Sequence, residues 1–306
     1  MASELISTTE AYGHEIDLFN EIREIGWRET PFFSSLTAKA PRARAGAAFG
    51  HQWKFMNTPS GSAANKHLEG AASPTATKHL LGQGLNHYQI VRNAFGVTRS
   101  EQKALGIDDK KELERQADMA RIQHMLSIEM AMCSANSAVQ RTDAVAGQMA
   151  GIKSFLTANT DLDMAIAGVG QTLTWAMLRE ILKPSFKKGT ALKILMMNDT
   201  QKDALDDILF SKTMNQNMTN TKIDNNTTII GQTAYGNNIK VILNPFLADD
   251  EIIGYNTEMI HPVLWDPTHI SDVKGDFDGV KKEFITELTL HVGHEYAVTR
   301  LKGLAV

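Results

Sequence analysis

The 306-residue sequence has little cysteine, no long apolar run and no excess of one charge. Its single cysteine, Cys133, cannot form a disulfide within the chain, which excludes a disulfide-stabilised scaffold. Apolar runs such as Ile194 to Met197 end well short of the roughly 18 residues that a membrane-spanning helix needs. Lys and Arg number 31 against 35 Asp and Glu, so no overall positive field attracts nucleic acid. These absences predict a soluble protein whose main task is not tight DNA binding.

The first twenty residues have neither a basic segment nor an apolar segment of the kind that directs secretion. We therefore expect synthesis and use in a reducing cytoplasm. With 42% apolar residues, the chain can bury the core of one large or two modest domains.

Catalytic signatures are missing as well. The glycines at Gly168 and Gly170 supply only a fragment of a phosphate-binding loop, and we interpret them as a turn. His291 and His294 resemble zinc ligands in spacing, but residues an odd number apart on a strand point to opposite faces. Cys133 is predicted to lie in the core, without a positive neighbour that would activate its thiol. The sequence predicts no catalytic residue, no metal and no cofactor.

The first 36 residues are predicted to form an arm that docks elsewhere. Apolar residues recur every three positions between Glu15 and Trp27, which suits a short amphipathic helix. The proline of Thr30-Pro31-Phe32-Phe33 breaks this pattern, and two adjacent phenylalanines need a surface to bury against.

An extended loop follows the arm. Phe49, Trp53 and Phe55 alternate with polar residues, as do Tyr88 and Ile90, and both segments are predicted to be strands. Between them, residues 57–84 consist mostly of small and polar residues, a stretch far longer than an ordinary hairpin loop. Its large apolar residues are only Leu68, Leu80 and Leu81. The segment cannot build a core, so we expect it to gain order only on another surface.

A single long helix is predicted from Asp108 or Asp109 to about Ser137, since this stretch has neither Gly nor Pro. Its expected buried stripe advances by three or four residues: Met119, Ile122, Leu126, Met130 and Cys133. Such a helix is longer than a small domain is wide, and we interpret it as a spine that joins parts.

The remaining chain indicates an α+β region. It predicts a helix from Thr174 to about Leu182, a buried strand from Leu192 and a helix from residue 198 or 199 to Phe210. Short strands are predicted at Ile229, at 239–243 and at 252–255. Finally, Phe284, Leu288, Leu290 and Val292 alternate with Glu283, Glu287 and His291, which predicts a long strand with one wet face.

The order of these parts resembles the tailed-phage major capsid proteins of the Hong Kong type, in particular a family of phage major head proteins. The matching tracts cover nearly the whole chain: TPFFS at 30–34, HQWKF at 51–55, LEGA at 68–71, NHYQI at 86–90, VTRSEQKALG at 97–106, SIEMAM at 127–132, GIKSFLTAN at 151–159 and GDFDGVKKEFITELTLHVGHEYAVTRLKGL at 275–304. Each tract alone is weakly specific, and their collinear order carries the resemblance.

The resemblance implies a capsid subunit with the Hong Kong-type fold and four parts. The first part is an N-terminal arm at 1–36. The second, at 37–144, contains an extended loop (about 44–95) and a peripheral domain with the spine helix (108–137). The third is an axial domain at 145–270, and the fourth is a C-terminal strand at 271–306 that returns to the peripheral domain. Because the chain starts almost directly at the arm, we expect no built-in scaffolding segment.

The resemblance also implies partners and a location. The subunit would bind copies of itself in hexamers and pentamers, the portal, and scaffold or decoration proteins where these exist. It would touch packaged double-stranded DNA weakly and non-specifically and would not bind a membrane. We expect it in the virion capsid, assembled in the cytoplasm of a bacterial host.

Candidate contact residues form two groups. Contacts between subunits are expected at Phe32, Phe33, Trp53, Lys66 and Glu69. The three aromatic side chains suit a buried interface, although the core of a monomer explains them equally well. The basic cluster Lys39, Arg42 and Arg44 could touch DNA or an acidic patch on a neighbour, or could simply be the solvated base of a loop.

Two other functions remain open on the sequence alone. A metal-dependent hydrolase would gather His261, His269 and Asp266, and would respond to a chelator. Another phage structural protein, such as a tail-tube subunit, shares the logic of self-assembly but would form tubes instead of closed shells.

Overall fold

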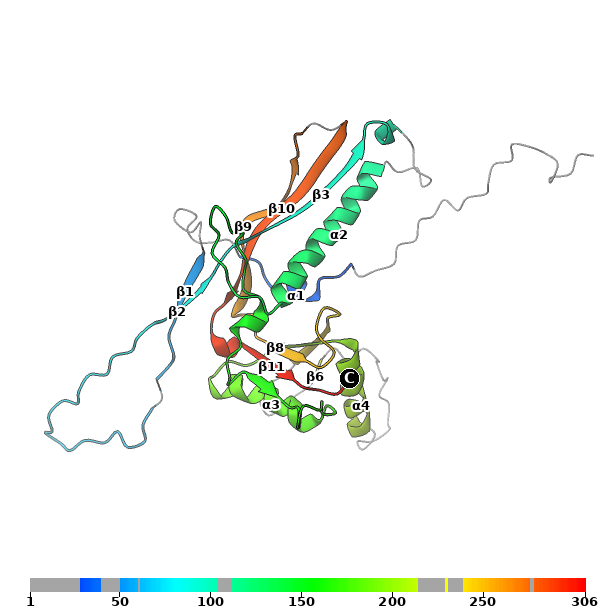
Figure 1. Cartoon of the computed structure of the whole chain (residues 1–306). Coiled ribbons are helices and arrows are strands. Elements are labelled where there is room, and N and C mark those ends of the chain that lie inside the picture. The colour runs from blue at the N-terminus through cyan, green and yellow to red at the C-terminus, as the bar shows by residue number, and fades with distance from the viewer. Residues whose placement is uncertain are drawn as a thin grey trace, which may run out of the picture.

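Two β-sheets and one long helix form the frame of the molecule (Figure 1). The computed structural model describes residues 28–39, 50–59, 61–103, 112–213, 229–230, 239–275 and 278–306. The helices are α1 (Pro31–Ser35), α2 (Glu112–Cys133), α3 (Trp175–Lys187) and α4 (Asp199–Thr213), with the short 3-10 helices η1 (Glu101–Lys103), η2 (Ile152–Phe155) and η3 (Glu295–Ala297). The predicted helix between residues 15 and 27 lies outside the described residues.

The strands form a hairpin and two sheets. The hairpin pairs β1 (His51–Phe55) with β2 (Gly82–Asn86). The first sheet has the antiparallel order β3 (Gln89–Thr98), β10 (Gly279–Val292), β9 (Ile260–Asp272). The second, mixed sheet has the order β4 (Asp161–Asp163), β11 (Val298–Lys302), β8 (Ile252–Tyr255), β5 (Ile194–Met197), β7 (Ile239–Leu243), β6 (Ile229–Ile230).

The spine helix α2 lies along the three-stranded sheet (Figure 1). It ends at Cys133, four residues earlier than the sequence predicts, and the carbonyl of Ser134 accepts from the N–H of Lys153 at 3.3 Å, beside the backbone of Gly151. A methyl group at Gly151 would lie only 2.3 Å from that carbonyl oxygen. The predicted start at residue 108 or 109 lies outside the described residues.

Of the predicted stripe of this helix, Cys133 is buried, Met119, Ile122 and Leu126 are only partly buried, and Met130 was wrong. Met130 is 58% exposed, and the residues that are buried are Ala120, His124, Ile128, Glu129, Met132 and Cys133. An apolar pattern cannot identify this face, because it contains a histidine and a glutamate. Burial of these two polar side chains is tolerated because each has hydrogen-bond partners within the fold.

One apolar core joins the two sheets. It combines Phe32 of α1, Ile128 and Met132 of α2, Leu288 and Leu290 of β10, Ile253 and Tyr255 of β8, and Val298 of β11. A second core fills the opposite face of the six-stranded sheet, where α3 and α4 pack. The three-stranded sheet with α2 therefore lies end to end with the six-stranded sheet and its helices α3 and α4 (Figure 1).

Helix α3 runs five residues beyond its predicted end at Leu182 and passes through Pro184. The proline removes one backbone donor, but the helix continues because Ser185 is buried and its hydroxyl donates to the carbonyl of Tyr296 at 2.7 Å. Gly189, with φ of 75°, then ends the helix in the left-handed conformation that favours glycine.

Sheet membership differs from the predicted division of the chain at two places. Strand β9, at 260–272, was assigned with the compact region but pairs with β10 beside the spine. Strand β11, at 298–302, was assigned with the returning C-terminal segment but lies between β4 and β8 in the six-stranded sheet. Local patterns do not specify that β11 pairs with the distant strands β4 and β8, nor that β9 and its neighbour β10 join β3 in one sheet.

The face of β10 that was predicted to be exposed to solvent is mostly covered, so this prediction was also wrong. Glu283 is only 8% exposed and forms a bidentate pair with Arg92 of β3. Glu287 pairs with Arg141 at 2.8 Å, and His291 contacts His51 of the hairpin. The alternating polar residues are therefore covered by side chains from other segments.

Across the described ranges, no helix combines the length and the apolar character required to cross a membrane.

Candidate assembly surface: arm, extended loop and their attachment

The arm is anchored by a buried carboxylate. Glu129 of the spine has no exposed surface, and its two oxygens accept the backbone N–H groups of Phe32 at 2.7 Å and Phe33 at 2.8 Å. Asn244 donates a third hydrogen bond to it at 2.9 Å. The first turn of a helix has unpaired N–H groups, and here a carboxylate from another helix accepts two of them. Burial raises the pKa of Glu129, which the three donors partly oppose.

The aromatic residues next to this anchor pack inside their own chain. Phe32 has no exposed surface, and its ring meets that of Tyr255 edge to face at 5.1 Å. The hydroxyls of Ser35 and Tyr255 lie 2.7 Å apart. Phe33 is partly buried against the same core. The monomer-core interpretation therefore applies to Phe32, which cannot be reached by a neighbouring subunit without rearrangement.

The basic cluster after α1 is described only at Lys39, since Arg42 and Arg44 lie outside the described residues. The backbone of Lys39 pairs with β9, donating to the carbonyl of Pro262 at 2.8 Å and accepting from Leu264 at 3.0 Å. Its ammonium group lies 2.8 Å from Nε2 of His261. The end of the arm is thus tied to the body as a short additional strand.

The extended loop leaves the body between β1 and β2 (Figure 1). Every described residue from 56 to 81 is exposed, and none belongs to a helix or strand. Its backbone hydrogen bonds are local, such as the one from the N–H of Ala71 to the carbonyl of Leu68, and at its base the side chain of Asn57 bonds to His294. Leu68 and Leu80 are 85% and 84% exposed, and Lys66 and Glu69 are exposed beside them. The predicted loop is confirmed, and its leucines have no cover within the described chain.

The root of the loop is an aromatic and histidine cluster. Trp53 of β1 packs against His291 of β10 with ring centroids 4.6 Å apart and against Phe155 of η2 at 6.2 Å. Its cross-strand partner is Gly84, where an added methyl group would lie 2.3 Å from the indole ring. Phe55 covers Gly82 in the same way. Each glycine leaves room for an aromatic ring, which fixes the register of the hairpin.

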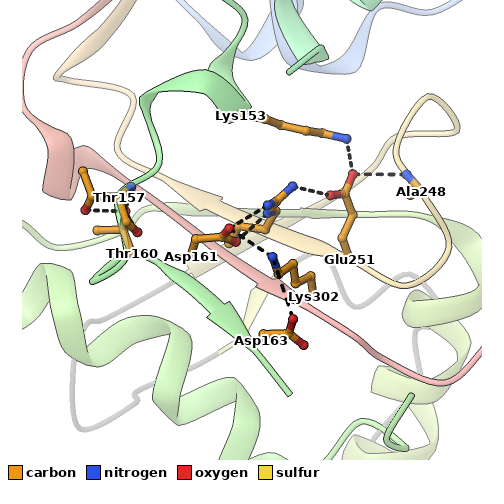
Figure 2. Close-up of polar contacts among 9 residues, drawn as sticks. Lys153, Thr157, Thr160, Asp161, Asp163, Ala248, Glu251 and Lys302 are labelled. Atoms are coloured by element: carbon orange, nitrogen blue, oxygen red, sulfur yellow. Dashed lines mark hydrogen bonds and ion pairs between the residues drawn. The ribbon is translucent and has the colours of Figure 1, made fainter. Parts of the chain in front are cut away.

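Below the hairpin, a network of charged side chains ties the six-stranded sheet together (Figure 2). Arg300 of β11 forms a bidentate pair with Asp161 of β4, both bonds being 2.8 Å, and lies 3.5 Å from Glu251, the residue before β8. Glu251 also pairs with Lys153 of η2, and Lys302 lies 3.3 Å from Asp161. The hydrogen bonds from Arg300 hold the pKa of Asp161 below its usual value. Because the cations and anions pair with one another, the network is a structural clamp.

The residues of the alternative metal site do not converge. His269 lies 3.5 Å from Asp266 on the exposed end of β9. His261 is eight residues from His269 along the strand, roughly 26 Å at the usual rise, and is buried at the other end. Within the described residues, no three His, Cys, Asp or Glu side chains are arranged to hold a metal ion. Cys133 is buried as predicted, and burial raises the pKa of its thiol.

Comparison with known proteins identifies the chain. The family model described as the SU10 major capsid protein matches residues 5–305. The chain belongs to this family. As a member it is a major capsid protein of a tailed phage, a structural protein of the virion.

Solved structures similar to this capsid protein agree on the fold. The capsid asymmetric unit of cyanophage A-1(L) matches with a TM-score of 0.69 at 14% identity over 99% of both chains. The capsid of a native GTA particle matches with a TM-score of 0.70 at 10% identity over the full length of both chains. Mycobacterium phage Bobi matches with a TM-score of 0.65 at 9% identity, covering 98% of this chain and 99% of that one. No curated protein matches significantly. The expected Hong Kong-type capsid fold is confirmed.

Two groups of the capsid protein were missed by sequence reasoning. One is the hydrogen-bonded pair of Glu129 and Asn244. Glu129 is the single charged residue of the mainly apolar SIEMAM tract. A lone glutamate in such a tract is a signal for a buried hydrogen-bonded carboxylate. The other is the cluster of His51, His261 and His291, which comes from three separate strands and leaves no local signal.

Proposed function

We propose that this major capsid protein builds the icosahedral phage head by binding copies of itself as hexamers and pentamers around packaged double-stranded DNA. The observation that carries the proposal is the loop at 56–81, which is exposed at every described position while presenting large apolar side chains. Fully burying one leucine stabilises a contact by about 1.5–3 kcal/mol. A neighbouring subunit is the surface on which Leu68, Leu80 and Leu81 would find that burial.

The role of each part in the shell follows from its position in the subunit. The loop projects from the two-sheet body, so it serves as a contact with neighbours, with Lys66, Glu69 and the partly exposed Phe33 and Trp53 at or near the interface. Phe32 instead secures the arm at its root. The spine and the three-stranded sheet form the peripheral part, and the six-stranded sheet with α3 and α4 forms the axial part, at the centre of each capsomer.

The ordering of the loop and the assembly of the shell are coupled in this proposal. Fixing one residue costs about 1–2 kcal/mol, so ordering residues 57–84 costs tens of kcal/mol. Contacts made only in the shell must offset this cost, and each can be modest because every subunit is held at several interfaces. The protein catalyses nothing and acts in the virion after assembly in the host cytoplasm. The portal, scaffold or decoration proteins, and weak DNA contacts through Lys39, Arg42 and Arg44 complete its partners.

The test replaces residues 56–81 with Asn-Gly. Phe55 and Gly82 are paired at the end of the hairpin, so a two-residue turn can close it without shifting the register. We expect a folded subunit with an unchanged thermal midpoint that forms no closed particles in negative-stain micrographs at pH 7.5. Closed shells of normal size from this variant would contradict the proposal.

A substitution series within the intact loop gives the matched control. Replacing Leu68, Leu80 and Leu81 together by serine removes the apolar surface and should abolish assembly. Replacing Ala63, Ala64 and Ala71 together by serine introduces as many hydroxyl groups into the same loop but removes little apolar area, and should leave assembly intact. Equal assembly by the two triple variants would show that the leucines do not make the contact.

A further inference from the structure

Strands β9 and β10, the hairpin strand β1 and the residue Lys39 meet at the root of the extended hairpin. The imidazoles of His51, on β1, and His291, on β10, approach with Nε2 and Nδ1 2.9 Å apart. The ring of His261, on β9, stacks on His291 with centroids 5.8 Å apart. Lys39, at the end of the arm, reaches Nε2 of His261 at 2.8 Å. The hairpin, the arm and the body therefore share one cluster of basic side chains.

The hydrogen bonds of the cluster require unprotonated nitrogens. A contact between two imidazole nitrogens needs one N–H and one lone pair, so His51 and His291 cannot both be fully protonated and keep it. An ammonium group has donors only, so Nε2 of His261 must offer its lone pair to Lys39. A proton on His261 removes this bond and places a second positive charge beside the ammonium group.

Carboxylates that could compensate these charges are engaged elsewhere. Glu287, on β10, pairs with Arg141, and Glu258, before β9, pairs with Lys193 at the surface. On η2, which packs against Trp53, the charged residue is Lys153, which pairs with Glu251.

Two further histidines lie close to the root of the hairpin. They are His87, whose ring lies beside Gly50, and His294, which bonds to Asn57 at 2.5 Å. In the described part of the chain, none of the three clustered histidines forms an ion pair with an acid.

Burial and the nearby positive charges keep the three histidines of the cluster neutral at pH 7. The pKa of His291 is lowered to about 4 by burial first and then by His51, His261 and Lys39. Burial also lowers the pKa of His51, and burial with Lys39 lowers that of His261. Histidines with a lowered pKa in the folded state stabilise it above their unfolded value of about 6.5 and lose this contribution as the pH falls toward about 4.

We propose that the cluster of Lys39, His51, His261 and His291 is a proton-sensitive latch, which holds the root of the extended hairpin on the body at neutral pH and releases it on acidification. The latch regulates the segment that the proposed function assigns to contacts between subunits, and only its consequence for assembly rests on that function. Acid would increase the freedom of the hairpin root while the spine helix stays folded.

The experiment uses the full-length, unassembled subunit. Hydrogen exchange is measured at pH 7.5 and pH 5.0 and corrected for the intrinsic exchange rate at each pH. We expect the protection of residues 51–55 and 82–86 to fall by about tenfold or more at pH 5.0, which corresponds to one unit of pKa shift, while α2 is unchanged. Equal protection of the hairpin at the two pH values would overturn the proposal.

Variants separate the latch from a general effect of acid. The double variant His51→Asn with His291→Gln keeps polar side chains that do not titrate, and should abolish the fall in protection. Its control is His269→Gln, which changes an exposed histidine on β9 outside the cluster and should behave as the wild type. A double variant that still loses protection at pH 5.0 as the wild type does would show that the cluster is not the sensor.

Lys39→Gln offers a second route at an exposed position that should not affect folding. It removes a positive charge that lowers the pKa of His261 and His291, so the fall in protection between pH 7.5 and pH 5.0 should be smaller than in the wild type, and an equal fall would contradict the proposal. The shell-forming test is run at pH 7.5, where the latch is closed, so the proposed function and the latch can fail independently.

Discussion

At the scale of single residues, the fully buried Glu129 decides how the arm is held. Replacing it by glutamine keeps the shape but leaves one oxygen where two accept from Phe32, Phe33 and Asn244. The new NH2 group faces a donor, so at least one buried N–H loses its partner. We expect Glu129→Gln to lower the free energy of unfolding by about 1–3 kcal/mol, measured by urea denaturation.

The matched control is Glu114→Gln, an exposed position on the same helix, which should change the free energy of unfolding by less than about 0.5 kcal/mol. If Glu129→Gln were as stable as the wild type, the carboxylate would not be the anchor of the arm. The lone glutamate of the SIEMAM tract indicates a buried carboxylate, but the sequence does not show which groups bind Glu129, and no pattern predicts the burial of His124. Both depend on partners that the fold brings from other elements, such as Thr286 at 2.7 Å from His124.

At the scale of elements, the two glycines of β2 explain why the hairpin keeps one register. In Gly84→Ala, the new methyl group would lie 2.3 Å from the ring of Trp53, which must leave its place against His291. We expect the hairpin to lose about 1–3 kcal/mol of local stability, seen as faster hydrogen exchange in residues 51–55 and 82–86 at pH 7.5.

Gly61→Ala is the control for this substitution, since nothing lies within 4 Å of the added group in the same loop. It should leave exchange in the hairpin unchanged. Unchanged exchange in Gly84→Ala would mean that Trp53 packs just as well elsewhere and that the glycine does not set the register.

Elements with a strong local pattern could be predicted from the sequence, and their boundaries less well. The alternation of Trp53 and Phe55 identified β1, and the absence of Gly and Pro identified the spine. Thr174 was correctly predicted as the start of α3, where its side chain accepts from the N–H of Met177. The end of α3 was missed, because Ser185 is held by Tyr296 from a distant part of the chain.

At the scale of the whole molecule, the order of the parts was predictable and their pairing was not. The collinear tracts pointed to the capsid fold, which the family match over residues 5–305 bears out. The placement of β9 beside the spine and of β11 in the other sheet could not be read from local patterns. The position of β11 is decided by contacts with segments distant in the sequence, β8 and β4, and that of β9 by which sheet its neighbour β10 joins.

The charged clamp links this long-range pairing to the stability of the whole subunit. Arg300 pairs with Asp161 of β4 and contacts Glu251, the residue before β8, and Glu251 pairs with Lys153 of η2. Since Ile152 of η2 lies in the core between the two sheets, the clamp connects the six-stranded sheet to the rest of the molecule.

Asp161→Asn should therefore lower the free energy of unfolding by about 1–3 kcal/mol at pH 7, because it removes the carboxylate that accepts both bonds from Arg300. Since the folded state lowers the pKa of Asp161, its contribution is complete above the unfolded value of about 3.8 and is lost as the pH falls through the folded value. Urea denaturation from pH 7 to pH 3 should show the wild type and the variant converging at the acid end.

Asp163→Asn changes a more exposed carboxylate of the same strand, 3.8 Å from Lys302, and should cost at most about 1 kcal/mol. Parallel curves for Asp161→Asn and the wild type across this range would show that the clamp adds nothing through the charge of Asp161. The two sheets would then be held together by their shared apolar core alone.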